Sequence, residues 1–101
     1  MICENLKKLL NDPVNVLVDV RTSYEYQQAR ITGSMSIPLH ELPHSVDHLK
    51  GKNVYVYCRS GARSGQAEMF LKGHGINSVN IGGLTSFMVV IVKIFHPCVF
   101  S

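Results

Sequence analysis

The chain has 101 residues, which is enough for one domain with a single modest core. Its 46% hydrophobic and 17% charged residues are typical of a globular protein and exclude a disordered chain. The net charge of +3 arises from lysines and arginines that are scattered along the chain, so we expect no nucleic-acid partner. A mildly basic protein of this kind is compatible with small anionic substrates.

The cysteine count bears on the compartment. Cys3, Cys58 and Cys98 are odd in number and lack paired spacing, which argues against a disulfide framework and against a zinc site. Charged residues such as Glu4 and Lys7 interrupt the N-terminal region, so no signal core is expected there. These observations predict a reducing compartment, with the cytoplasm as the default location.

The first third of the chain predicts two strands and two helices. Thr22 or Ser23 is placed to cap the second helix, and Glu25 lies in its first turn, where the helix dipole favours an acid. The expected elements are a short edge strand over residues 1–3, a helix over 4–10, a buried strand over 14–20 and a helix over 24–29.

The middle of the chain predicts a loop and then a second strand and helix. The expected elements are a turn at Gly33, a short strand at 36–37, a turn and short helix over 39–49, a buried strand over 54–57, a loop over 58–63, a helix over 64–74 capped by Ser64, and a strand over 78–81. Alternating strands and helices favour an α/β fold, with a mostly parallel sheet of about five strands flanked by helices.

Three histidines recur every four residues at His40, His44 and His48. This spacing invites a metal site, but Pro43 interrupts the helical face and no carboxylate or cysteine completes a ligand set. A solvated surface is the favoured interpretation, and we expect no metal.

The loop that follows residues 54–57 carries the chemistry. Cys58 follows a buried strand and begins the loop, Gly61 permits a tight turn, and a helix N-terminus comes next, so backbone N–H groups should form a cradle for an anion. Arg59 and Arg63 add positive charge. Such surroundings should lower the pKa of Cys58 and make it a nucleophilic thiolate, whereas a lone cysteine at a strand end is more often a small apolar residue.

The segment CRSGARS at residues 58–64 resembles the active-site loop of the rhodanese family of sulfurtransferases. The run DVRTSYEY…ITGSMSIP is similar to a second signature of the family, although Ala29-Arg30-Ile31 stands where Gly-His-Ile is usual. A third similar feature is Gly82-Gly83 followed by the aromatic Phe87. The resemblance covers residues 1–88 and implies a single rhodanese-like domain over residues 1–101.

The resemblance and the loop together indicate sulfur transfer. Cys58 would attack the outer sulfur of an anionic donor such as thiosulfate and hold it as a persulfide, which a thiol, cyanide or a sulfur-accepting protein then removes. No cofactor is expected. The residues expected to surround the sulfur and bind the donor are Arg59, Ser60, Gly61, Ala62, Arg63 and Ser64.

Four further residues are expected to support the loop. Asp19 and Arg21 lie at a strand end, where a charged pair is more often a structural ion pair than a catalytic unit. Gly82 and Gly83 should let their backbone pass close to the Cys58 loop.

Two other functions share this architecture. A cysteine-dependent phosphatase or arsenate reductase would place five residues between the cysteine and an arginine, but here only four separate Cys58 from Arg63, and Ser64 stands at the phosphatase spacing. The shorter loop favours a sulfur atom over a phosphoryl group. The second alternative is a non-catalytic binding module, because fold alone does not fix function.

The C-terminal residues 86–101 form an atypical apolar tail for this family. The run FMVVIVKIF is too short to span a bilayer, which needs about 20 apolar residues. It predicts a closing helix, an added strand or an interface with another copy of the chain, and the sequence leaves these open.

Overall fold

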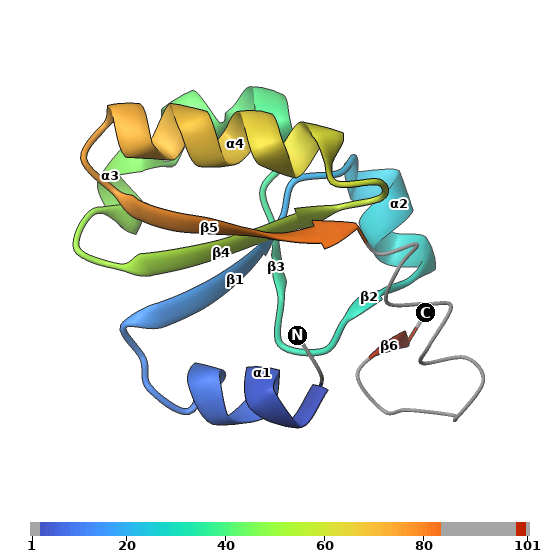
Figure 1. Cartoon of the computed structure of the whole chain (residues 1–101). Helices are drawn as coiled ribbons and strands as arrows, with labels where there is room; N and C mark the ends of the chain where they lie inside the picture. Colours follow the sequence, from blue (N-terminus) through green and yellow to red (C-terminus); the bar gives the residue numbers. More distant parts are fainter. Residues whose placement is uncertain (1–2, 84–98, 101) are drawn as a thin grey trace.

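The computed structural model describes residues 3–83 and 99–100 (Figure 1). Helices alternate with strands along most of this part of the chain. The helices are α1 (Cys3–Leu10), α2 (Ser23–Gln28), the 3₁₀ helix η1 (Leu39–His44), α3 (Val46–Leu49) and α4 (Ala62–Gly73). The strands are β1 (Asn15–Asp19), β2 (Arg30–Ile31), β3 (Met35–Ser36), β4 (Asn53–Cys58), β5 (Asn77–Gly83) and β6 (Val99–Phe100).

The main sheet is parallel, with the strand order β3-β1-β4-β5. The α/β architecture with helices flanking a parallel sheet is therefore confirmed. Within the described residues this sheet has four strands rather than about five. The edge strand expected over residues 1–3 is wrong at Cys3, which begins α1, and residues 1–2 lie outside the described part.

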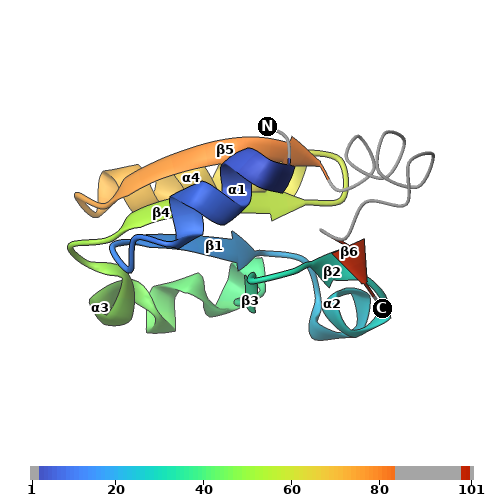
Figure 2. The ribbon, with the colours of Figure 1, turned by 90° about the horizontal axis from the view of Figure 1, so that it is seen from below.

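Side chains of the central strands alternate between two cores. Val54, Val56 and Cys58 face the cluster beneath α4, η1 and α3, whereas Tyr57 belongs to a second cluster with Leu6 of α1. Figure 1 shows α4 and α3 on one side of the sheet and α1 on the other, and Figure 2 shows α1 across the strands from below. Burial on both faces is what selects the continuous apolar runs of parallel strands.

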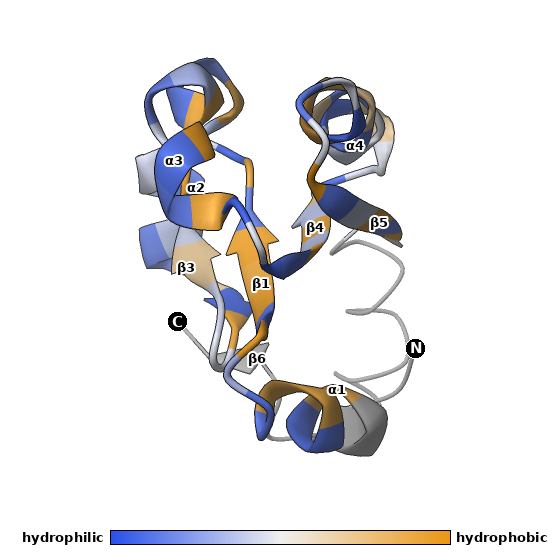
Figure 3. Cartoon of the chain, turned by 90° about the vertical axis from the view of Figure 1, so that its left-hand side faces the viewer, coloured by the Kyte–Doolittle hydropathy of each residue, from blue (hydrophilic) through white to orange (hydrophobic). Residues whose placement is uncertain are grey.

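Strand β1 shows this burial on both faces most clearly. It carries hydrophobic colouring in Figure 3, and its residues Leu17 and Val18, on opposite faces, are both buried. The buried strand expected over residues 14–20 is thereby confirmed, with bounds that are one residue shorter at each end.

Most of the apolar tail lies outside the described residues. The prediction for residues 86–101 is untested over 86–98 and 101, whereas Val99–Phe100 form β6, which pairs antiparallel with β2. In the part of the chain that the structure describes, no helix is both long and apolar enough to cross a membrane.

Candidate active site

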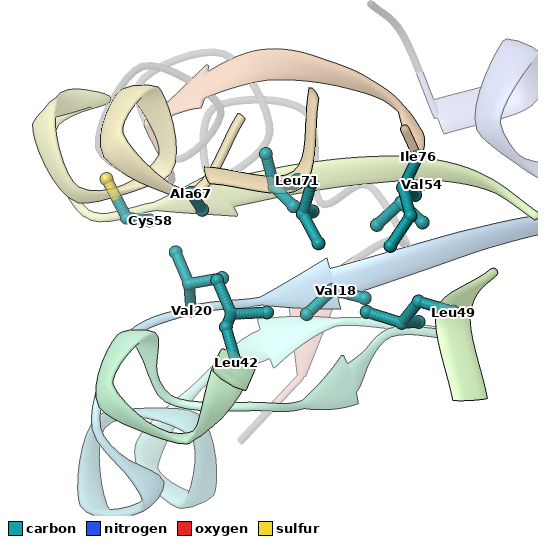
Figure 4. Packing of buried hydrophobic residues seen from close by; sticks show 10 residues of the cluster. Val18, Val20, Leu42, Leu49, Val54, Cys58, Ala67, Leu71 and Ile76 are labelled. Atoms are coloured by element: carbon teal, nitrogen blue, oxygen red, sulfur yellow. The ribbon is translucent and has the colours of Figure 1, made fainter. Parts of the chain in front are cut away.

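Cys58 is the last residue of β4, the strand that lies between β1 and β5 in the sheet. The carboxyl end of a central parallel strand is where open α/β sheets place their ligands. The Cys58 side chain is buried and lies at one end of the larger core cluster, near Ala67 of α4 (Figure 4). The fold thus brings a thiol to the start of a helix.

The turn after Cys58 is tighter than expected. Helix α4 begins at Ala62, and its N-cap is Gly61 with φ = 100°, a left-handed conformation that favours glycine. The loop therefore spans only residues 59–61, and the prediction that Ser64 caps the helix is wrong. Ser64 lies in the first turn of α4, fully buried, and its hydroxyl is placed to donate to the Gly61 carbonyl oxygen.

Several donors converge on the Cys58 sulfur. The Gly61 backbone N–H donates at 2.9 Å, and the Ser64 Oγ lies 3.3 Å from Sγ. Burial by itself raises the pKa of the Cys58 thiol. Hydrogen bonds from the Ser64 hydroxyl and from the backbone N–H groups of Ser64, Gly61 and Ser60 outweigh that effect, so its pKa lies below the usual value. This arrangement stabilises a thiolate.

The paired glycines at the end of β5 allow close approach of this loop. A Cβ on Gly83 would lie 2.8 Å from Ser60 Cα and closer still to the Arg59 carbonyl oxygen. Gly82 adopts φ = 106°. At Gly83 the two backbones approach so closely that a side chain would collide, whereas a Cβ on Gly82 would meet nothing within 4 Å.

Replacing Gly83 with alanine should therefore displace the Cys58 loop. We expect a loss of about 1–3 kcal/mol in the free energy of unfolding, since backbone atoms cannot move aside as a side chain can. Urea unfolding measures the effect. The control is Gly73→Ala at the end of α4, where a Cβ meets nothing within 4 Å and should be neutral or stabilising. Equal effects of the two substitutions would contradict this account.

Arg63 is held by a residue that is distant in sequence. Its Nη1 and Nη2 donate to the two carboxylate oxygens of Glu25, at 2.8 and 3.0 Å. Of the two predicted caps, Thr22 and Ser23, Thr22 caps α2, and it forms a capping box with Glu25. The hydrogen bond from Arg63 is the largest cause that lowers the pKa of Glu25, to about 2. The sequence placed Glu25 only as a first-turn acid, and its tertiary partner was missed.

Glu25→Gln should accordingly change how stability depends on pH. The Arg63–Glu25 pair stabilises the fold above the ordinary glutamate pKa of about 4.5, and this stabilisation is lost as the pH falls toward 2. At neutral pH we expect Glu25→Gln to cost about 1 kcal/mol, the scale of a partly exposed pair with good geometry. The difference from the parent chain should shrink in urea titrations between pH 5 and 2, whereas a constant difference would contradict the assignment.

Arg59 differs from Arg63 in its surroundings. Arg59 is exposed, and among the described residues its side chain makes no ion pair or hydrogen bond. Arg63 uses two of its N–H donors on Glu25 and remains about one-third exposed. Arg59 is thus the first residue of the three-residue loop and is open to solvent, whereas Arg63 lies in the first turn of α4 and is held by Glu25.

Asp19 and Arg21 form the structural ion pair that the sequence suggested. Both are buried, and Arg21 Nε lies 2.9 and 3.0 Å from the two carboxylate oxygens. Arg21 also donates to the Ala29 carbonyl, and the Tyr57 hydroxyl accepts the Ile31 N–H. This network ties the end of β1 to β2 and to β4, the strand that carries Cys58.

Two other groups of residues lie away from the cysteine loop. Among the described residues no three His, Cys, Asp or Glu side chains gather as metal ligands. His40 and His44 are in η1, and His48 follows in α3. A cavity of about 320 Å³ lies between the start of α2, residues 36–38 and η1, and no residue of the cysteine loop lines it.

Comparison with known proteins was made by family, sequence and structure. The rhodanese-like domain family matches residues 3–89. A sulfurtransferase of Allochromatium vinosum is 40% identical over 78 residues, which cover 75% of this chain and 73% of the relative. The thiosulfate sulfurtransferase PspE of Escherichia coli is 38% identical over 80 residues, covering 75% and 77%.

A third relative is much longer than this chain. The tRNA uridine(34) hydroxylase of Pectobacterium atrosepticum is 30% identical over 83 residues, but the match spans only 23% of its length. Among solved structures, a protein from Staphylococcus saprophyticus has a TM-score of 0.72 and 34% identity, covering 86% of this chain and 90% of its own. The match of the family to most of the chain and the structural likeness agree with the cysteine loop, and the chain belongs to the rhodanese-like domain family.

Proposed function

We propose that the chain is a sulfurtransferase that moves a sulfane sulfur from thiosulfate or a similar anionic donor to a thiophilic acceptor through a persulfide on Cys58. The observation that carries the proposal is the pair of donors on one buried sulfur, the Gly61 N–H at 2.9 Å and the Ser64 Oγ at 3.3 Å. Donors fixed in this way stabilise negative charge on sulfur before any substrate arrives.

The first step joins two sulfur atoms. The Cys58 thiolate attacks the outer sulfur of thiosulfate, the S–S bond of the donor breaks, and sulfite leaves with the electron pair. The enzyme then carries a Cys58 persulfide with one negative charge on its outer sulfur. In the second step cyanide or a thiolate, on a small molecule or an acceptor protein, attacks that outer sulfur and Cys58 leaves as the thiolate. The charges and electrons balance without a metal or organic cofactor.

Arg59 and Arg63 contribute to binding of the donor in different ways. Arg59, exposed and without a partner in the described part of the chain, is free to meet the sulfonate oxygens of thiosulfate. Arg63 keeps N–H donors beyond the two it uses on Glu25, and that pair fixes its guanidinium at the rim of the loop. Arg63 therefore contributes a positioned charge, and Arg59 contributes an adaptable one.

The relatives support sulfur transfer over hydroxylation. The two sulfurtransferases match over 73% and 77% of their lengths, so most of each protein is shared with this chain. The shared region is under a quarter of the tRNA hydroxylase. The cycle also needs a free thiolate, and we expect the chain to work in a reducing compartment such as the cytoplasm.

Loop length distinguishes this proposal from a phosphatase or arsenate reductase. We expect thiosulfate:cyanide sulfurtransferase activity and no hydrolysis of p-nitrophenyl phosphate above background. The segment from Cys58 to Ser64 has serine, not arginine, at the position from which a phosphatase holds the phosphoryl group. Phosphate hydrolysis without thiocyanate formation would refute the proposal. The absence of both activities, with the fold intact, would favour the non-catalytic module.

Arg59→Ala tests how the donor is recognised. Losing a charged hydrogen bond from an exposed site should raise the KM for thiosulfate about tenfold. The matched control is Lys72→Ala on the last turn of α4, which removes the same charge from the other end of that helix. An unchanged KM in Arg59→Ala, or an equal rise in Lys72→Ala, would remove Arg59 from donor binding.

A further inference from the structure

The Ser64 hydroxyl has one proton and more than one place to donate it. Its Oγ lies 2.7 Å from Asn80 Oδ1, 3.1 Å from the Gly61 carbonyl oxygen and 3.3 Å from Cys58 Sγ. A hydroxyl donates a single hydrogen bond at a time. The three acceptors therefore compete for the Ser64 proton, and the strongest hydrogen-bond acceptor among them receives it.

Asn80 joins this hydroxyl to Gly61 at the end of the Cys58 loop and to Gly82 of β5. Its Oδ1 also accepts the Gly82 N–H at 2.9 Å, and its Nδ2 donates to the Gly61 carbonyl oxygen at 3.2 Å. Its backbone N–H donates to a carboxylate oxygen of Glu68 at 3.0 Å. The Asn80 side chain is thus fixed from several directions, and the element left free to turn is the Ser64 O–H.

The charge on the Cys58 sulfur determines which acceptor receives the hydrogen bond from Ser64. A neutral thiol is a weak acceptor, so the short contact to Asn80 Oδ1 is favoured while Cys58 is protonated. A negatively charged sulfur accepts a much stronger hydrogen bond. We propose that Ser64 and Asn80 form a hydroxyl switch, in which the Ser64 proton points to Asn80 when Cys58 is uncharged and turns to the Cys58 sulfur when that sulfur is anionic.

The switch leaves no buried group without a partner in either state. When the Ser64 proton turns to sulfur, Asn80 Oδ1 still accepts the Gly82 N–H. When the proton returns to Asn80, the Gly61 N–H remains 2.9 Å from Cys58 Sγ. For the thiolate the inference stands on geometry alone, whereas its extension to the persulfide rests on the proposed function.

Two charged groups near Cys58, Arg63 and Glu25, keep their charges near neutral pH. The hydrogen bond to Glu25 is the largest cause that raises the pKa of Arg63, to which the Coulomb interaction with Cys58 also contributes, and Arg63 in turn lowers the pKa of Glu25 to about 2. A change in the Cys58 titration near neutral pH therefore reports on its hydrogen bonds. The charged or titratable groups of the surrounding elements are Asp19, Glu25, Tyr57, Arg59, Arg63 and Glu68.

Ser64→Ala removes the hydroxyl and keeps the backbone donors. The rate of iodoacetamide alkylation against pH should then show the Cys58 inflection raised by about one to two pKa units, the value of one hydrogen bond to a charged group. The matched control is Ser78→Ala, because Ser78 is also buried but donates to the Glu68 carbonyl instead of to sulfur. An unchanged inflection in Ser64→Ala, or an equal rise in Ser78→Ala, would overturn the proposal.

Asn80→Asp tests the switch without removing the hydroxyl. A carboxylate at this position holds the Ser64 proton more strongly, so the Cys58 inflection should rise, and Asn77→Asp at the other end of β5 should leave it nearly unchanged. The rise should be smaller in a chain that already carries Ser64→Ala, because part of it acts through the hydroxyl. An equal rise in both backgrounds would mean that Asn80 acts by charge alone and would overturn the switch.

Alkylation does not depend on sulfur transfer. If the variants show the expected shifts but the parent chain makes no thiocyanate, the hydroxyl switch stands and the proposed function is refuted. If the parent chain makes thiocyanate but the variants show no shifts, the proposed function stands and the hydroxyl switch is refuted. Thermal unfolding of each variant identifies any chain that has lost its fold. Since Ser64→Ala and Asn80→Asp perturb different atoms, failure of one to fold leaves the other to decide.

Discussion

Replacing Cys58 with serine is expected to abolish sulfur transfer, leaving thiocyanate formation at the background rate. A serine hydroxyl is not ionised at neutral pH and cannot hold a sulfane sulfur, so both half-reactions are lost. The protein should remain folded, because serine is close to cysteine in size and Ser60, Gly61 and Ser64 still supply hydrogen-bond donors. The assay is steady-state thiosulfate:cyanide turnover at saturating thiosulfate.

The other two cysteines provide the control. Cys3→Ser and Cys98→Ser should keep activity, because the cradle of donors is built around residue 58. Activity in Cys58→Ser comparable to that of the parent chain would show that another group carries the sulfur. Loss of activity in all three variants would indicate that the assay follows folding instead of chemistry.

Asp19→Ala is expected to have the largest effect on stability, about 3–5 kcal/mol in the free energy of unfolding. It leaves Arg21 buried with its charge unpaired, and it removes the acceptor of the Arg21 backbone N–H. The loss should appear as a large fall in the midpoint of urea unfolding, with the slope unchanged.

Asp47→Ala is the matched control for that result. Asp47 also lies 3.5 Å from a basic side chain, Lys50, but its side chain is 93% exposed. Surface pairs of this kind contribute little, so the midpoint should barely move. If Asp19→Ala were as mild as Asp47→Ala, the pair with Arg21 would not be what holds the end of β1 in place.

Much of the fold could be predicted because local patterns and tertiary needs agree. Residues 54–57 read as a buried strand, and β4 is buried on both faces as the pattern requires. Thr22 and Glu25 form the capping box that their three-residue spacing permits. The start of α4 was misplaced because Gly61 caps the helix by its left-handed backbone, which leaves no side-chain signal of the kind that Ser64 appeared to give.

The candidate site also has one part that could be predicted from the sequence and another part that could not. Cys58 and the donors at Gly61 and Ser64 are contiguous in sequence, and their roles follow from a strand, a turn and a helix start. Glu25 and Asn80 reach the loop only through the packing of α2 and β5 against it, at sequence separations of 38 and 16 residues from their partners. No local pattern reports such contacts, and both residues had to be found in the structure.

Intact-mass spectrometry after incubation with thiosulfate tests the central claim most directly. The account predicts that the parent chain gains one sulfur atom, about 32 mass units, that cyanide removes it, and that Cys58→Ser gains none. A parent chain that turns over thiosulfate without ever carrying the added mass, or a Cys58→Ser chain that carries it, would contradict the persulfide on Cys58.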